Sequence, residues 1–239
     1  VTVSSSLYGF IPIYNVYSFT CTSVQGIAVK FKALLWEDSM EQPLKTLQLG
    51  IILLASYCLG GCMMVRGETL ELPKQWPPEK PSVMKSIVLS TKGQFQSGSA
   101  SPEQTTPHGI QLIEGQAQKA YSESALFKQV SLTSPESDIH AEITVTEKGS
   151  QALAGISGFI CGFTMFVVPG YASATMDMET VFKDVGGREL GKIYKSESVS
   201  FWMQLFLIAA MPFKDSPKTV IRDVYYDLNR ATLEEARNK

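Results

Sequence analysis

Alternating apolar and polar residues, the pattern of a strand with one buried face, are the clearest signal in the chain. Over 139–146 the apolar positions are Ile139, Ala141, Ile143 and Val145, and the residues between them are polar. The same alternation recurs over 171–183, and the Gly186-Gly187 turn that follows predicts a hairpin with a return strand over 188–200. A shorter apolar run predicts a first strand over about 86–96.

Two other segments repeat apolar residues every three or four positions, as an amphipathic helix does. The first covers about 115–130. The second covers 216–236 and starts with Ser216 as N-cap and Pro217 at the first helical position, and its charged residues are expected to face solvent. Strands and helices that do not alternate strictly favour the α+β class. We therefore predict the order β-α-β-β-β-α, with both helices on one face of a small antiparallel sheet.

Two apolar runs interrupt this pattern, at 152–170 and 201–213. No residue between Lys148 and Asp177 is charged, although several glycines and Pro169 make a membrane-spanning helix unfavourable. The second run would reach about 20 Å as a helix at 1.5 Å per residue, short of the roughly 30 Å hydrocarbon core of a bilayer. Because the two runs flank one hairpin, the end of the first and the start of the second are expected to lie side by side.

These two runs have two interpretations. In the first, both pack in the core of the domain. In the second, they form one exposed apolar surface, too large for an ordinary monomer, that docks into lipid or a partner subunit. The residues assigned to this surface are Phe159, Phe163, Phe166, Trp202, Phe206 and Leu207. Trp202 would then sit at the water boundary, where indole is favoured.

A third apolar run, from Lys45 to Cys62, has the layout of a secretory signal peptide: one cation, an uncharged apolar stretch, and small residues before a cysteine. The alternative is a buried or transmembrane helix, but an apolar stretch of about a dozen residues is short for a span of about 20. Translation is expected to begin at Met40, which makes 40–61 the signal peptide. Residues 1–39 are then an uncertain upstream segment, and a genuine aromatic-rich N-terminal segment is the alternative.

The residues Leu59-Gly60-Gly61-Cys62 resemble the lipobox of bacterial lipoproteins. The resemblance implies cleavage after Gly61, a diacylglyceryl thioether and an acylated amino group on Cys62, and a location in the cell envelope. Met63-Met64 follows in place of the Asp that retains such lipoproteins in the inner membrane, so the resemblance favours the outer membrane, facing the periplasm. The proline-rich stretch 62–82 is then expected to be a tether to a domain over 83–239.

Composition and motifs exclude several functions. The chain has 21 Lys and Arg against 23 Asp and Glu, so no basic field exists to attract nucleic acid. His108 and His140 lack visible catalytic partners, and Cys161 lies in an apolar run that disfavours a thiolate. No dinucleotide, phosphate-loop or metal-binding motif is present. We expect a protein that is not an enzyme and that has no cofactor apart from the covalent lipid on Cys62.

The arrangement over 138–236 resembles that of small uncharacterised bacterial lipoproteins. The shared parts are a strand, an apolar run ending in Val167-Val168-Pro169, a hairpin around Gly186-Gly187, a run containing Trp202, and a terminal helix. This resemblance implies a location but no activity. We predict a membrane-anchored envelope lipoprotein that is a binding or structural component, with membrane lipid and another envelope protein or a second copy as partners. The alternative is an integral membrane protein whose hydrophobic segments pack against other subunits.

Overall fold

The computed structural model describes residues 61–133, 136–204, 207 and 215–238. Its strands are β1 (Gly61–Arg66), β2 (Lys85–Ser97), β3 (Glu103–Gln104), β4 (Phe127–Ser131), β5 (Ile139–Gly149), β6 (Gly170–Asp184) and β7 (Glu189–Gln204). Its helices are α3 (Pro107–Glu123), α4 (Gln151–Phe163) and α5 (Pro217–Arg237). The expected segment 1–39 and nearly all of the expected signal peptide 40–61 lie outside the described residues.

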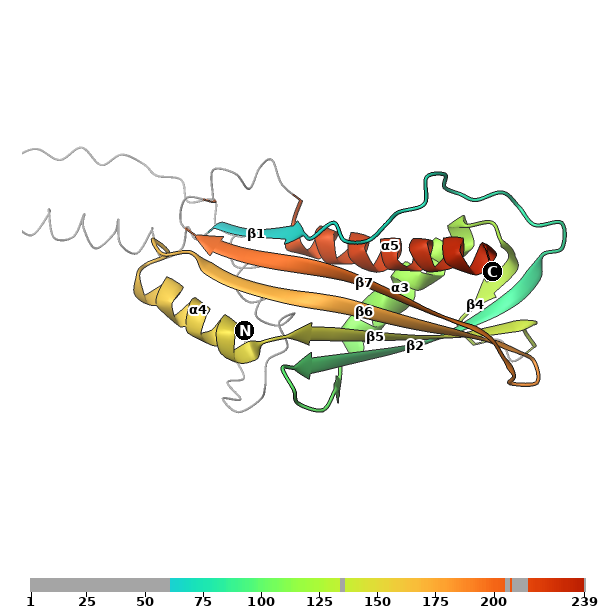
Figure 1. Cartoon of the computed structure of the whole chain (residues 1–239), viewed down its shortest axis with the longest axis horizontal. Coiled ribbons are helices and arrows are strands. Elements are labelled where there is room, and N and C mark those ends of the chain that lie inside the picture. The colour runs from blue at the N-terminus through green and yellow to red at the C-terminus, as the bar shows by residue number, and fades with distance from the viewer. Residues whose placement is uncertain (1–60, 134–135, 205–206, 208–214, 239) are drawn as a thin grey trace, which may run out of the picture.

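The strands form one mixed sheet in the order β1-β7-β6-β5-β2-β3, and β4 pairs with β2. Helices α3 and α5 lie side by side on one face of this sheet, and α4 lies at one end of it (Figure 1). The predicted α+β class is therefore confirmed. The sheet is not wholly antiparallel, because β2 pairs in parallel with both β4 and β5. The chain crosses over through α3 between β2 and these strands, as a parallel pairing requires.

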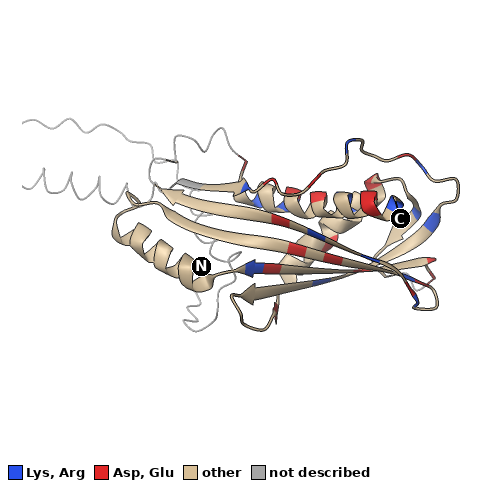
Figure 2. Cartoon of the chain, viewed as in Figure 1, with Lys and Arg blue, Asp and Glu red and all other residues tan. Residues whose placement is uncertain are grey.

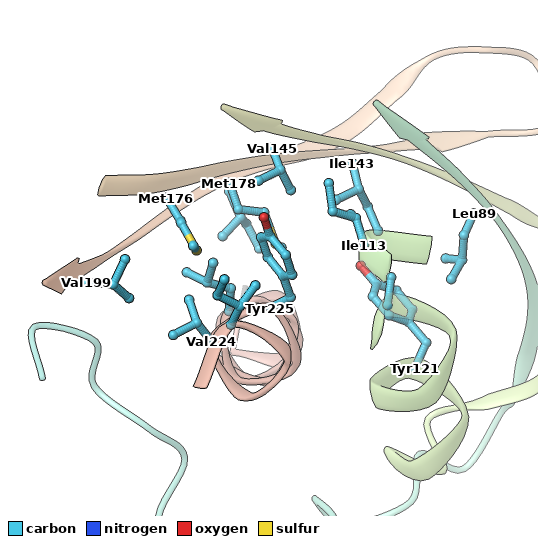
Figure 3. Close-up of a cluster of buried hydrophobic side chains, with 14 of the residues drawn as sticks. Leu89, Ile113, Tyr121, Ile143, Val145, Met176, Met178, Val199, Val224 and Tyr225 are labelled. Carbon is cyan, nitrogen blue, oxygen red and sulfur yellow. The ribbon is translucent and has the colours of Figure 1, made fainter. Parts of the chain in front are cut away.

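The hydrophobic core lies between the sheet and helices α3 and α5 (Figure 3). The alternating residues of β5 face it as predicted: Ala141, Ile143 and Val145 are all buried. They meet Leu228 and Tyr225 of α5, which are buried as well. The helix α5 begins where the sequence places it, because the Ser216 side chain accepts a hydrogen bond from the Thr219 N–H.

The first predicted helix has different bounds. We expected it over 115–130, but α3 starts at Pro107, where the Thr106 side chain accepts a hydrogen bond from the Gly109 N–H at 3.3 Å. The segment after Ala125, a residue with a φ of 55°, forms β4 instead of a last helical turn. A left-handed residue of this kind is common where a helix gives way to another element.

The stretch expected to be a tether is part of the folded body. The backbone of β1 pairs with β7 along its whole length, from Gly61 opposite Gln204 to Arg66 opposite Val199. The following segment, residues 67–84, which we call the strap, passes along α5 before the chain enters β2 (Figure 1). The folded part therefore begins before Val83.

Side chains fasten the strap to the body. The Thr69 hydroxyl donates to Glu197 Oε1 at 3.1 Å, on β7. Further along, the Trp76 Nε1–H donates to the Tyr226 hydroxyl at 3.1 Å, and the guanidinium of Arg230 lies 5.0 Å from the centre of the Trp76 ring. A proline-rich segment that is held by such contacts lacks the freedom of a linker.

The charged side of α5 is partly covered as well. We expected its acidic and basic residues to face solvent, but Asp227 is only 7% exposed. Arg66 Nη1 donates to Asp227 Oδ2 at 2.6 Å, and Arg66 Nη2 lies 3.4 Å from Oε2 of the fully buried Glu197. We call Arg66, Glu197 and Asp227 the clamp, because together they join β1, β7 and α5.

Candidate functional site

Three strands meet at the end of the sheet where α4 lies. In the register of the sheet, Met203 of β7 is opposite both Cys62 of β1 and Gly170 of β6. Neighbouring strands are about 4.8 Å apart, so the backbones of Cys62 and Gly170 are separated by about 10 Å. The expectation that the two apolar runs lie side by side at the base of the hairpin is confirmed by this register.

Helix α4 packs closely on this end of the sheet. A methyl group placed on Gly170 would lie 3.0 Å from Cys161 Cβ, so the glycine is what allows the helix to approach the strand. The Cys161 thiol donates to the Met203 carbonyl at 3.3 Å, and Ser157 Oγ accepts from the Tyr171 N–H at 2.6 Å. Small and polar side chains therefore make the contact between α4 and the body.

The large apolar side chains of α4 point away from the protein. The exposed fractions are 68% for Leu153, 60% for Ile156, 72% for Phe159, 45% for Ile160 and 81% for Phe163. Cys161 is the helix's buried residue. An ordinary surface helix buries its apolar stripe and exposes polar residues. In α4 this arrangement is inverted.

The residues beside α4 extend the apolar surface. The helix ends at Phe163, and Met165 and Phe166 take positive φ angles of 52° and 64°, which turn the chain back toward β6. Val167 and Val168 are 56% and 41% exposed. We call the exposed apolar residues of α4 and of 165–168 the apolar end.

Two aromatic residues with polar atoms border the apolar end. Tyr171 of β6 lies opposite Trp202 of β7, and their ring centres are 4.7 Å apart. Both are partly exposed, and the Tyr171 hydroxyl lies 3.4 Å from Ser200 Oγ. Tyr and Trp are the residues favoured where one side of a ring is apolar and the other is wet.

Figure 2 shows that α4 and the neighbouring ends of β6 and β7 carry no charged residue. Lys148, at the end of β5, is the charged residue that precedes α4, and it pairs with Asp177 at 2.8 Å. Although burial acts to raise the pKa of Asp177, hydrogen bonds from Lys148 and Ser196 hold it below its usual value. Burial and the nearby Asp177 carboxylate raise the pKa of Tyr194 to about 12. These groups form a polar network on the uncovered face of the sheet.

The residues predicted for the apolar surface fall into three groups. Phe159 and Phe163 are well exposed, and Trp202 is 37% exposed. Phe166 and Leu207 are half-buried, and Phe206 lies outside the described residues. The prediction missed the other outward residues of α4. Their spacing of three and four positions, opposite small residues such as Ser157, is the signal that reveals them.

The candidates for catalysis are not brought together. His140 lies on the uncovered face of β5, and Cys161 is buried, which raises the pKa of its thiol. Within the described ranges, no group of three His, Cys, Asp or Glu residues is placed to hold a metal ion. The same residues include no helix that is long and apolar enough to cross a membrane.

The fold and the site thus define an α+β protein with an inverted apolar helix at one end of a mixed sheet. No protein-family profile and no curated protein matches the sequence. Among solved structures, the chain is similar to a PelC dodecamer from Paraburkholderia phytofirmans, at 10% identity and a TM-score of 0.31, over 72% of this chain and 96% of that one. It is also similar to a DUF4136 family protein from Bacteroides thetaiotaomicron, at 11% identity and a TM-score of 0.31, over 74% and 96% of the two chains.

Proposed function

We propose that this chain is an envelope lipoprotein that is anchored through Cys62 and acts by binding, as a structural component and not as a catalyst. The observation that carries the proposal is the place of Cys62. Cys62 lies at the start of β1, at the same edge of the molecule as the apolar end, with its backbone about 10 Å from that of Gly170. Lipid on Cys62 and the apolar residues of α4 would then face the same surroundings.

The position of Cys62 in β1 changes how such an anchor would work. An extended tether of about twenty residues would let the domain move some 60 Å from the membrane, at about 3.1 Å per residue. Here the residues after Cys62 pair with β7 instead, and Arg66 is held by the clamp. An acyl group on Cys62 would therefore hold the body directly against the bilayer.

Incorporation of a clickable fatty acid tests the anchor. The full chain should be labelled, Cys62→Ala should not, and the matched control Cys161→Ala should be labelled like the parent. Mass spectrometry of the labelled protein should place its N-terminus at Cys62. Separation of inner and outer membranes on a density gradient then tests the outer-membrane location. Equal labelling of the parent and Cys62→Ala would refute the anchor.

A further inference from the structure

We propose that α4 lies in the surface layer of a lipid bilayer, with Leu153, Ile156, Phe159, Ile160 and Phe163 among the acyl chains. This inference rests on the proposed function, which supplies the envelope membrane. It adds that α4 is the element in contact with that membrane and that lipid is what covers its outward side. The occupant is lipid, and a second copy of the chain is the competing outcome.

The outward direction of the apolar side chains of α4 indicates contact with an apolar environment. Its contact with the sheet is made through Ser157, Cys161 and Gly170, which lets the helix pack closely without its large side chains. Transfer of those side chains out of water would be favourable, because each of them exposes apolar surface. A helix that turns them outward is suited to surroundings that are themselves apolar.

The length of α4 favours a helix that lies at the bilayer surface over one that spans the bilayer. Its 13 residues extend about 20 Å along the helix axis, at 1.5 Å per residue. That is short of a hydrocarbon core of about 30 Å. A helix of this length whose outward side is apolar fits the boundary between head groups and acyl chains, where such helices lie flat. In this case the protein body takes the place of the charged side that other interfacial helices carry.

The chemistry of the outward side chains favours lipid over a protein partner. The exposed residues of α4 named above carry hydrocarbon side chains only, whereas a protein interface has about one hydrogen bond per 100–200 Å². The borders of the surface also fit a bilayer. Tyr171 and Trp202 lie at its edge, and Lys148 lies just before the helix, at the level where charged head groups would begin.

Depth-sensitive fluorescence in the full chain tests this contact. Cys21 and Cys58 are replaced by Ser, a cysteine is introduced as Phe159→Cys, and an NBD dye is attached to it. The matched control is Val185→Cys, which is 71% exposed in the turn at the far end of the sheet. Each protein is reconstituted in vesicles of phosphatidylethanolamine and phosphatidylglycerol, with and without doxyl-labelled lipid. Circular dichroism shows whether each labelled chain is folded, and Phe163→Cys replaces Phe159→Cys if the latter is not.

We expect the dye on α4 to emit at shorter wavelength in vesicles and to be quenched by doxyl lipid, while the dye at 185 is quenched by iodide in the water. Equal quenching by iodide at both sites would overturn the proposal. Energy transfer between α4 sites on two copies, without quenching by doxyl lipid, would replace it with a contact between copies. The fatty-acid experiment shows whether Cys62 is acylated, and the dye experiment is also run with Cys62 replaced by Ser, so a failure of the anchor and a failure of the helix contact are distinguishable.

Discussion

We predict that the clamp stabilises the fold by holding β1 against β7 and α5. Replacing Arg66 by Met keeps most of the side chain's volume but removes the cation that joins two carboxylates. Arg66 Nη1 is 2.6 Å from Asp227 Oδ2, and Nη2 is 3.4 Å from Glu197 Oε2. Because Glu197 is fully buried, its carboxylate cannot recover the lost contact from water.

The loss in the free energy of unfolding expected for Arg66→Met depends on which contacts the two carboxylates keep. Removing one partner of a fully buried ion pair costs about 3–5 kcal/mol. The Arg66 side chain is 24% exposed, and Glu197 still accepts hydrogen bonds from Thr69 and from the Ser198 N–H. Asp227 also keeps Arg230, at 3.0 Å. We therefore expect a loss of about 2–3 kcal/mol in the free energy of unfolding, below the range for a fully buried pair.

Urea unfolding followed by tryptophan fluorescence measures this loss. At roughly 2 kcal/mol per M of urea, the midpoint of Arg66→Met should fall by about 1–1.5 M. The matched control is Arg222→Met, at an exposed position of α5, the helix that carries Asp227, and it should stay within about 0.5 kcal/mol of the parent. If both variants unfold at the same urea concentration as the parent, the clamp contributes nothing to stability and the reasoning is wrong.

Three more predictions concern the packing of α4 and the polar side chains of Glu147 and Tyr121. Gly170→Ala should lower stability by about 1–3 kcal/mol, because its new carbon would lie 3.0 Å from Cys161 Cβ. Gly158→Ala, where that carbon meets nothing within 4 Å, should raise it by about 0.5–1 kcal/mol; thermal melts that show the same sign for both would contradict this. Burial raises the pKa of Glu147 above the ordinary 4.5, so the part of the stability that Glu147 contributes should be fully present below that pH and be lost as the pH rises through the folded-state pKa. Urea midpoints of Glu147→Gln should show a smaller fall, and an identical pH profile would disprove the assignment. Tyr121→Phe removes a buried hydroxyl without a partner among the described residues, so calorimetry should find stability unchanged or up to about 1 kcal/mol higher, not lower.

The elements that the sequence predicts well are those set by a local pattern. In β5, Ile143 and Val145 alternate with polar residues, and helices α3 and α5 cover the face that this alternation makes apolar. In α5, the Ser216 N-cap and the apolar residues at every third or fourth position both predict the helix that is observed. The start of α3 carries the same signal, since Thr106-Pro107 has the composition of Ser216-Pro217. Because the residues around it are polar, the helix was expected to start only at about 115.

The features that were not predicted depend on contacts between distant parts of the chain. Arg66 and Asp227 are 161 residues apart in sequence, and Trp76 and Tyr226 are 150 apart. A proline-rich stretch indicates a linker when its neighbours in sequence are considered alone. Its prolines are in fact compatible with an extended segment that lies along α5, because a strap needs no backbone hydrogen-bond ladder of its own.

The same limit applies to the site. The sequence correctly predicts that the two apolar runs meet at the base of a hairpin, since a hairpin brings its own ends together. It does not say whether the runs turn inward or outward. That choice depends on which residues of α4 fit against Gly170, and the close approach there favours the small ones, Ser157 and Cys161. The outward direction of Phe159 follows from this packing and not from its own hydrophobicity.

An acyl anchor at Cys62 and an interfacial helix would have different tasks. Covalent lipid contributes about 0.8 kcal/mol per buried CH₂ group, so the several acyl chains that the lipobox implies would suffice for attachment. One point of attachment leaves the body free to pivot about it. Because β1 is joined to β7 by the sheet and to α5 by the clamp, Cys62 and α4 belong to one rigid body. A second contact about 10 Å away along the same edge would then fix the tilt of the sheet to the membrane, and the charged, uncovered face would be presented in a constant direction. On this proposal the apolar end would govern orientation, and the lipid would govern attachment.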